Sequence, residues 1–150
     1  MEYFSDNFRI TTDKGQMNID TIHQLLVKTY WAATRSKSTQ EACMRSSLCY
    51  GLFDGDEQIG FARVISDYAT FAYLCDVVIA EPYRGRGLAK WMMSCILEHP
   101  QLQGMRRWLL STRDAHEFYA KFGFAPLSKP EKFMEIYRPA EQDTSSPPDD

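Results

Sequence analysis

Long apolar runs are missing from this chain, and its first residues lack the pattern of a secretory signal. No apolar stretch approaches the roughly 20 residues that a membrane-spanning helix needs. Residues 1–6 contain no basic region followed by an apolar stretch, which argues against a secretory signal. We therefore expect a soluble, cytoplasmic protein with no membrane partner.

The sequence also lacks closely spaced cysteine pairs and an overall excess of basic residues. The four cysteines form no C-x-x-C pair and lie in apolar segments, which favours buried thiols over a disulfide framework or a zinc site. We therefore expect no metal. The net charge is −3, and residues 140–150 hold four acidic residues and no Lys or Arg, so the remaining body carries +1. Without a basic patch, sequence-independent binding to nucleic acid is disfavoured.

The apolar content suits one well-packed core. Apolar residues make up 44% of the 150 residues and aromatic residues 13%, in a chain too short for two ordinary domains. We expect a single domain over residues 1–139. Residues 140–150, rich in Pro and Asp, lack the apolar content to order themselves, so we expect a disordered acidic tail there.

The most informative stretch, residues 77–90, is an apolar strand that runs through a short turn into a glycine-rich helix start. Gly85 and Gly87 remove side chains where a ligand must come close. The first amides of the following helix are unpaired within it and point outward, with the positive dipole end behind them. Arg84, Arg86 and Lys90 add positive charge, so the stretch predicts a site for a polyanionic, phosphate-bearing cofactor.

Two common glycine motifs are absent from this stretch. A dinucleotide-binding G-x-G-x-x-G would need a third glycine at Lys90, and a Walker A loop would need Gly-Lys-Ser/Thr after four intervening residues. Residues 84–89, Arg-Gly-Arg-Gly-Leu-Ala, are instead similar to the R/Q-x-x-G-x-G/A signature of the GNAT superfamily of acyl-CoA-dependent N-acetyltransferases. Ala89 stands where Gly is more usual, a substitution that the signature allows.

A second stretch, residues 118–124, carries the same resemblance. Its sequence Phe-Tyr-Ala-Lys-Phe-Gly-Phe is similar to the L/F-Y-x-x-x-G-F of the last GNAT helix, whose tyrosine is usually the acid. The resemblance implies that Tyr119 protonates the departing thiolate, and a phenol with an ordinary pKa near 10 can do so. The alternative is a core tyrosine beside Phe118 and Phe122.

The resemblance also implies a binding mode for acetyl-CoA, the acyl donor. In GNAT proteins the strand before the glycine turn splays away from its parallel neighbour, and its free amides hold the pantetheine and the thioester carbonyl. The residues assigned to the donor in this way are Val77, Val78, Ile79, Arg84, Gly85, Arg86, Gly87, Leu88, Ala89 and Lys90. Two alternatives remain. Residues 77–79 could form an ordinary strand whose amides are all paired, and Arg84, Arg86 and Lys90 could be solvated cations at the start of a helix.

Asp76 is the exception in the otherwise apolar run 70–79. A buried carboxylate needs a partner or a raised pKa, so Asp76 is our candidate general base beside the implied thioester site. Pairing with Arg63 or another cation is the alternative. Glu81 and His116 are weaker candidates, and many GNAT enzymes deprotonate the amine through water.

Apolar periodicity and turn residues predict the elements. We expect strands over 3–12, 48–53, 58–65, 70–79, 107–112 and 133–137, and helices from Asn18 or Asp20, over 38–46, from Leu88 to before Pro100, and from Asp114 to Phe122. This order predicts an α/β (α+β) fold of the GNAT type. Its mixed, mostly antiparallel central sheet is flanked by helices, with one parallel β-α-β unit at the cofactor site.

We therefore expect an N-acetyltransferase that moves acetyl from acetyl-CoA to a primary amine in a direct ternary complex. The alternatives are a non-catalytic acyl-CoA-binding regulatory module and a protein-interaction domain that uses the tail. The acceptor stays open, because its pocket is built from loops that vary within the fold. Trp31 is either part of that pocket or a core residue of the first helix. A homodimer also stays open, because relatives commonly dimerise.

Overall fold

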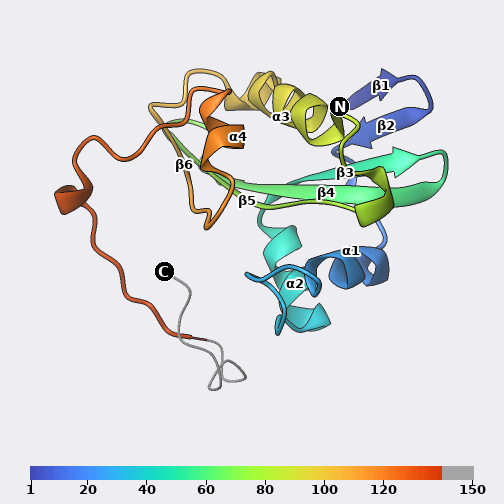
Figure 1. The fold of residues 1–150 in the computed structure, drawn as a ribbon, viewed down its shortest axis with the longest axis horizontal. Helices are drawn as coiled ribbons and strands as arrows, with labels where there is room; N and C mark the ends of the chain where they lie inside the picture. Colours follow the sequence, from blue (N-terminus) through green and yellow to red (C-terminus); the bar gives the residue numbers. More distant parts are fainter. Residues whose placement is uncertain (140–150) are drawn as a thin grey trace. The chain divides into compact units, whose positions relative to one another are not determined.

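A six-stranded sheet forms the centre of the computed structural model, which describes residues 1–139 (Figure 1). The strands lie in the order β1-β2-β3-β4-β5-β6. Their bounds are Glu2–Ser5, Phe8–Thr11, Leu48–Asp54, Glu57–Ser66, Phe71–Ile79 and Arg107–Leu110. Neighbouring strands are antiparallel except for the parallel pair β5 and β6. The predicted mixed, mostly antiparallel sheet with one parallel β-α-β unit is confirmed.

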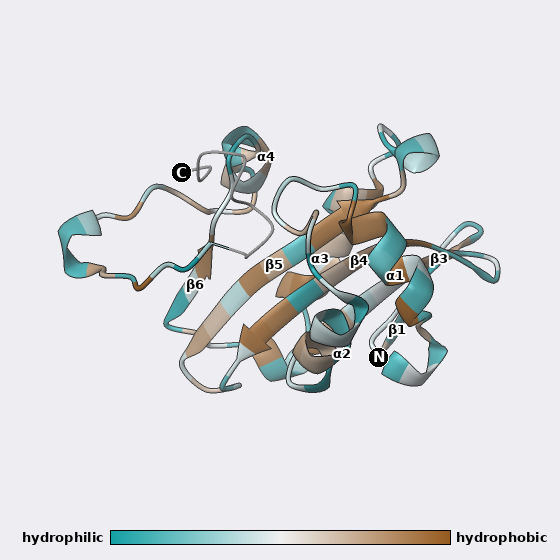
Figure 2. Cartoon of the chain, turned by 90° about the horizontal axis from the view of Figure 1, so that it is seen from below, coloured by the Kyte–Doolittle hydropathy of each residue, from teal (hydrophilic) through white to brown (hydrophobic). Residues whose placement is uncertain are grey.

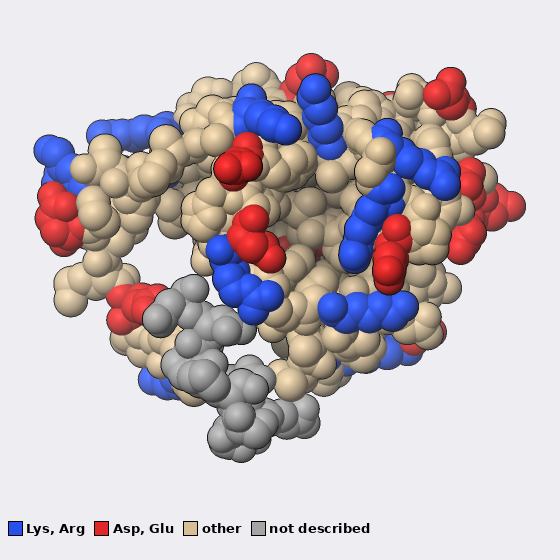
Figure 3. All heavy atoms as spheres, in the orientation of Figure 1, with Lys and Arg blue, Asp and Glu red and all other residues tan. Residues whose placement is uncertain are grey.

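Helices cover both faces of the sheet. The helix between the parallel strands, α3 (Leu88–Leu97), lies on one face, and α1 (Ile19–Leu26) and α2 (Lys37–Arg45) lie on the other (Figure 1). None of the helices in residues 1–139 is long and apolar enough to cross a membrane. On the face drawn in Figure 3, cationic and anionic side chains are intermixed.

Side-chain caps set the starts of α1 and α2. Asn18 accepts a hydrogen bond from the amide of Thr21, as expected for an N-cap. Ser36, rather than the predicted Ser38, caps α2, because its hydroxyl accepts from the amide of Thr39 at 3.1 Å. The predicted cap was therefore wrong by two residues, and α2 begins at Lys37.

The described residues divide into two compact units, residues 1–110 and the residues from 111 to 139. In the first unit, a core cluster joins α1 and α2 to the sheet. Its buried members are Ile22, Leu26, Ala32, Met44, Cys49, Phe61 and Val78. Much of β4 and β5 is apolar in Figure 2, as two-sided burial requires. Ala32 is buried whereas Trp31 is 42% exposed, so Trp31 does not continue the core stripe of α1.

Both ends of the described chain differ from the prediction. The expected single strand 3–12 is a hairpin, because Asp6 adopts a φ of +52° and reverses the chain between β1 and β2. The expected strand 133–137 is irregular, with Met134 98% and Ile136 86% exposed. That prediction was wrong: a strand needs a neighbour, and among residues 1–139 none pairs with this segment.

The second unit holds α4 (His116–Ala120), which is shorter than predicted. Asp114 does not cap it; the N-cap is Ala115, which makes no side-chain cap bond. The strand before it, β6, likewise ends at Leu110 rather than at Thr112.

Candidate active site

The parallel pairing of β5 with β6 stops halfway along β5. The register joins 71–74 of β5 to 107–110 of β6, and β5 continues to Ile79. Within residues 1–139, no strand pairs with this later half of β5 on the side of β6. The predicted thioester and pantetheine residues Val77, Val78 and Ile79 all lie in this half. An open strand edge offers the hydrogen-bonding groups that an extended ligand needs.

The opposite edge of β5 is distorted at Asp76. In the antiparallel register with β4, Arg63 faces Cys75 and Phe61 faces Val78, so one residue of β4 lies opposite two of β5. This is a β-bulge, and Asp76 within it has a φ of +55°, a left-handed conformation that is rare for a residue with a side chain. Bulges redirect side chains, and the side chain of Asp76 meets three partners from two parts of the first unit, β4 and the loop between α1 and α2.

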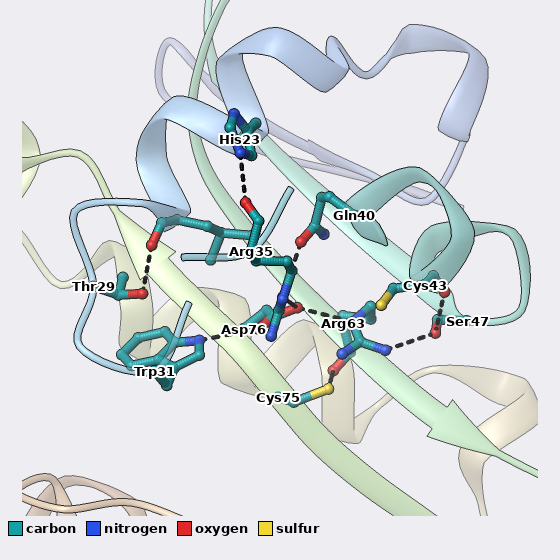
Figure 4. Close-up of polar contacts among 11 residues, drawn as sticks. His23, Thr29, Trp31, Arg35, Gln40, Cys43, Ser47, Arg63, Cys75 and Asp76 are labelled. Carbon is teal, nitrogen blue, oxygen red and sulfur yellow. Dashed lines mark hydrogen bonds and ion pairs between the residues drawn. The ribbon is translucent and has the colours of Figure 1, made fainter. Parts of the chain in front are cut away.

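The carboxylate of Asp76 accepts three hydrogen bonds (Figure 4). Its Oδ1 accepts from the indole Nε1 of Trp31 at 3.0 Å. Its Oδ2 accepts from Nη1 of Arg35 at 2.7 Å and from Nε of Arg63 at 2.9 Å. Arg63 lies on β4, whereas Trp31 and Arg35 belong to the loop between α1 and α2. Asp76, which is 3% exposed, thus ties that loop to the centre of the sheet.

The pKa of Asp76 reflects two opposed effects. Burial raises the pKa, but the charges of Arg35 and Arg63 and their hydrogen bonds outweigh burial, so the pKa lies below its ordinary value of 3.8. The carboxylate is therefore ionised at neutral pH and holds a proton poorly. These contacts favour the pairing alternative that the sequence left open for Asp76, and they add Arg35 and Trp31 to the predicted partner Arg63.

Further contacts fix the two arginines. Nη1 of Arg35 also donates to Oε1 of Gln40 at 2.9 Å, and the backbone carbonyl of Arg35 is hydrogen-bonded to Nε2 of His23 at 2.7 Å. Nη1 of Arg63 donates to the hydroxyl of Ser47 at 3.2 Å. We call Trp31, Arg35, Gln40, Ser47, Arg63 and Asp76 the Asp76 cluster. A charge within an apolar strand signals that partners exist, but nothing in the sequence identifies most of them.

The glycine turn, residues 84–87, has few side-chain contacts. Gly85 and Gly87 have φ of +79° and +77°, which is the region that favours glycine. Gly87 is the N-cap of α3 and provides no side chain to occupy the first amides of the helix. Arg84 donates through Nε to the carbonyl of Ile79 at 3.0 Å, and the guanidinium of Arg86 lies 5.2 Å from the ring centre of Tyr83.

The other predicted donor residues lie at the start of α3. Lys90, like Arg84 and Arg86, is exposed, whereas Leu88 is 6% exposed and packs in the core. Leu88 is therefore available to a ligand through its backbone alone. The predicted path of strand, glycine turn and helix is present in the first unit, with its cations on the surface.

Tyr119, the predicted acid, lies on α4 in the second unit. Its ring is half-buried, with the ring centres of Phe118 and Phe124 at 5.1 and 6.0 Å. The motif ends at Gly123, whose φ of +97° turns the chain after the helix. His116, on the same helix, and Glu81, in a short 3-10 helix of the first unit, are both exposed.

All four cysteines carry free thiols. Burial raises the pKa of Cys49 and Cys95 to about 11 and that of Cys75 to about 12. Among residues 1–139, no group of three or more His, Cys, Asp or Glu side chains is placed to hold a metal ion.

Among the described residues, β5 is unpaired along one edge of its later half and leads through a glycine turn into the start of α3, as the resemblance to GNAT proteins implied. Residues 19–124 match the sequence model of the Acetyltransferase (GNAT) family. The chain therefore belongs to the GNAT acetyltransferase family and is an acyltransferase, as its sequence predicted.

Individual relatives agree with this assignment. A crystal structure from Xanthomonas campestris pv. campestris, assigned to the GNAT family, superposes with a TM-score of 0.86 at 44% identity, covering 88% of this chain and 94% of the other. A sequence from Gibberella zeae, described as an acetyltransferase, is 29% identical and covers 77% of each chain. A GNAT acetyltransferase from Elizabethkingia anophelis, solved with acetyl-CoA bound, shares the fold at a TM-score of 0.65 and 16% identity, covering 89% of this chain and 90% of the other.

Proposed function

We propose that this enzyme transfers the acetyl group of acetyl-CoA to a primary amine by direct attack within a ternary complex. The observation that carries the proposal is the later half of β5, which no strand of the described residues 1–139 joins on the side of β6 and which runs directly into the glycine turn. An acyl donor with an extended, amide-rich arm and a pyrophosphate needs these two features in this order.

In the proposed complex the donor lies along β5 and the start of α3. The backbone groups of residues 77–79 that face the open edge of β5 bind the pantetheine and the thioester carbonyl, and the amides of residues 85–90 surround the pyrophosphate. The exposed cations Arg84, Arg86 and Lys90 neutralise the phosphates. Leu88 and Ala89 take part through their backbone.

The proposed chemistry needs no covalent intermediate. The neutral amine attacks the thioester carbon, a C–N bond forms, and the C–S bond breaks. Amides of β5 stabilise the oxyanion that develops on the carbonyl oxygen. Tyr119 gives its proton to the departing thiolate and regains one from solvent, and the proton lost by the amine passes to water. The low pKa of Asp76 supports a positioning role, in which its carboxylate holds Trp31 and Arg35 in place.

A two-part experiment tests this function against the non-catalytic alternative. Acetyl-CoA should raise the melting temperature of the protein, and an amine panel containing amino acids, amino alcohols, polyamines and a peptide amine should release CoA. Replacing both Arg84 and Arg86 with Gln should weaken acetyl-CoA binding about tenfold or more while leaving the fold intact, because both side chains are exposed. Protection by acetyl-CoA without CoA release from any amine would instead support a binding module. Tyr119→Phe should retain binding and lose turnover.

A further inference from the structure

One edge of the Arg35 guanidinium is unused. Both hydrogen bonds of the side chain leave from Nη1, toward Asp76 and Gln40. Within residues 1–139, Nε and Nη2 have no hydrogen-bond partner, and neither is among the buried side-chain atoms that lack one. These two nitrogens therefore reach solvent, although the side chain as a whole is only 19% exposed.

The unused edge has a specific shape. The N–H of Nε and one N–H of Nη2 point in the same direction in a planar guanidinium, which is the fork that receives the two oxygens of a carboxylate. The fork is also held in place, because Nη1 is fixed by two acceptors and the backbone carbonyl of Arg35 is fixed by His23. A held guanidinium loses little side-chain freedom when it binds a ligand.

The surrounding charges favour an anion at this fork. Asp76 carries one negative charge against the two positive charges of Arg35 and Arg63, so this ion group keeps one unit of positive charge. The ring of Trp31 stands beside it, 42% exposed, with its N–H already committed to Asp76. An apolar ring beside a cationic fork suits a small molecule that has a carbon skeleton and a carboxylate.

The side chain that carries the fork is hydrogen-bonded to the start of the proposed donor site. Arg35 and Trp31 are bonded to Asp76, the residue directly before the β5 amides that we assign to the thioester. A group held by Arg35 would therefore place its neighbouring atoms close to the donor carbonyl. Lys37, two residues further along, is paired with Asp20 and is 46% exposed, which makes it a matched cation outside the cluster.

We propose that Arg35 binds the carboxylate of the acceptor, so that the acceptor is an amino acid or a similar amine with a nearby carboxylate. This inference rests on the proposed acetyl transfer and narrows its substrate class. Arg35 acts in it as a specificity residue that contacts the substrate, with Asp76, Gln40 and His23 positioning it.

Matched acceptor pairs test the proposal. Glycine, L-alanine and L-phenylalanine are compared with ethanolamine, L-alaninol and L-phenylalaninol, in which a hydroxymethyl group replaces the carboxylate, and O-phosphoethanolamine is the phosphate arm. The wild-type enzyme should show a kcat/KM about 10- to 100-fold higher for the best amino acid than for its alcohol, as a bidentate charge-assisted contact allows. Equal use of both members of each pair, or preference for the phosphate, would overturn the proposal.

Substitution of Arg35 sharpens the test. Arg35→Gln should lower kcat/KM for the amino acid alone, so that the ratio of kcat/KM for the amino acid to that for its alcohol falls toward one. Arg35→Lys keeps the charge without the fork and should retain only part of the wild-type preference. Lys37→Gln should leave the ratio unchanged. A fall in both rates to the same extent in Arg35→Gln, with acetyl-CoA binding and circular dichroism unchanged, would contradict substrate contact.

A binding measurement separates this proposal from the proposed function. With CoA present, isothermal titration should show that N-acetylglycine or N-acetyl-L-phenylalanine binds the wild-type protein more tightly than the matching N-acetyl alcohol, and that Arg35→Gln abolishes the difference. If no amine is acetylated but this preference is found, the function fails and the carboxylate site stands. If amines are acetylated without any preference in rate or binding, the function stands and the carboxylate site fails.

Discussion

Side chains build the Asp76 cluster, whereas backbone builds the glycine turn. In the cluster a carboxylate that is 3% exposed is held by side chains from β4 and from the loop between α1 and α2. In the turn, two glycines with positive φ and exposed cations leave the first amides of α3 without a side-chain cap. The cluster should therefore depend on residue identity, and the turn on backbone conformation.

Removal of the central carboxylate should have the largest effect on stability. Asp76→Ala leaves two arginines poorly exposed and without their anion, so we expect the free energy of unfolding to fall by about 3 kcal/mol. Urea denaturation measures the change. The control is Asp20→Asn, which breaks an exposed ion pair with Lys37 and should change the free energy by less than about 1 kcal/mol. Equal losses in the two variants would contradict the structural importance of the cluster.

A change in the turn should have a smaller effect on stability and a clear effect on donor binding. Gly87→Val forces a β-branched residue to a φ of +77°, so we expect a loss of about 1 to 3 kcal/mol together with weaker acetyl-CoA binding. Gly87→Asn should lose less, because asparagine tolerates this conformation better. Apart from the glycine and its two chain neighbours, no atom of residues 1–139 lies within 4 Å of an added Cβ, so strain rather than collision is tested. Identical losses for Val and Asn would contradict this account.

The smallest expected effect is on pH dependence. A carboxylate whose pKa is lowered in the folded state contributes stability above its unfolded pKa, and that contribution is lost as the pH falls through the folded value. Because the pKa of Asp76 lies below 3.8, the difference in unfolding free energy between wild type and Asp76→Asn should stay constant from about pH 5 to 8. Below about pH 4 this difference should shrink.

The same variant tests the general-base hypothesis. If Asp76 took the amine proton, the wild-type rate profile would contain an acidic limb that Asp76→Asn lacks. We expect the two profiles to have the same shape and to differ in height alone, because the carboxylate does not titrate over the working range.

The contrast between the two regions also explains what the sequence could predict. The glycine turn is a contiguous stretch whose conformation depends on its own glycines, so its motif and its strand and helix could be predicted locally. The partners of Asp76 are 13, 41 and 45 residues away in sequence, and only Arg63 was anticipated. Contacts between residues so far apart in sequence are determined by how the helices pack on the sheet, which no local sequence pattern encodes.

The two ends of the described chain show the same limit. Apolar composition favoured a strand over 133–137, yet a strand exists only where another can pair with it, and this segment leaves Met134 and Ile136 exposed. At the other end, composition favoured a single strand, and the turn at Asp6 depends on a left-handed conformation that a non-glycine residue seldom adopts. The predicted single domain over 1–139 stays a prediction beside the two units observed.

The most direct test of the central claim is a balance of products. The purified protein is incubated with acetyl-CoA and the amine panel, and free CoA and acetylated amine are quantified together by mass spectrometry. The account predicts that CoA release depends on the amine and that one acetylated amine forms for each CoA released. Tight acetyl-CoA binding with no acetylated amine would contradict the claim, and so would CoA release that is not matched by formation of an acetylated amine.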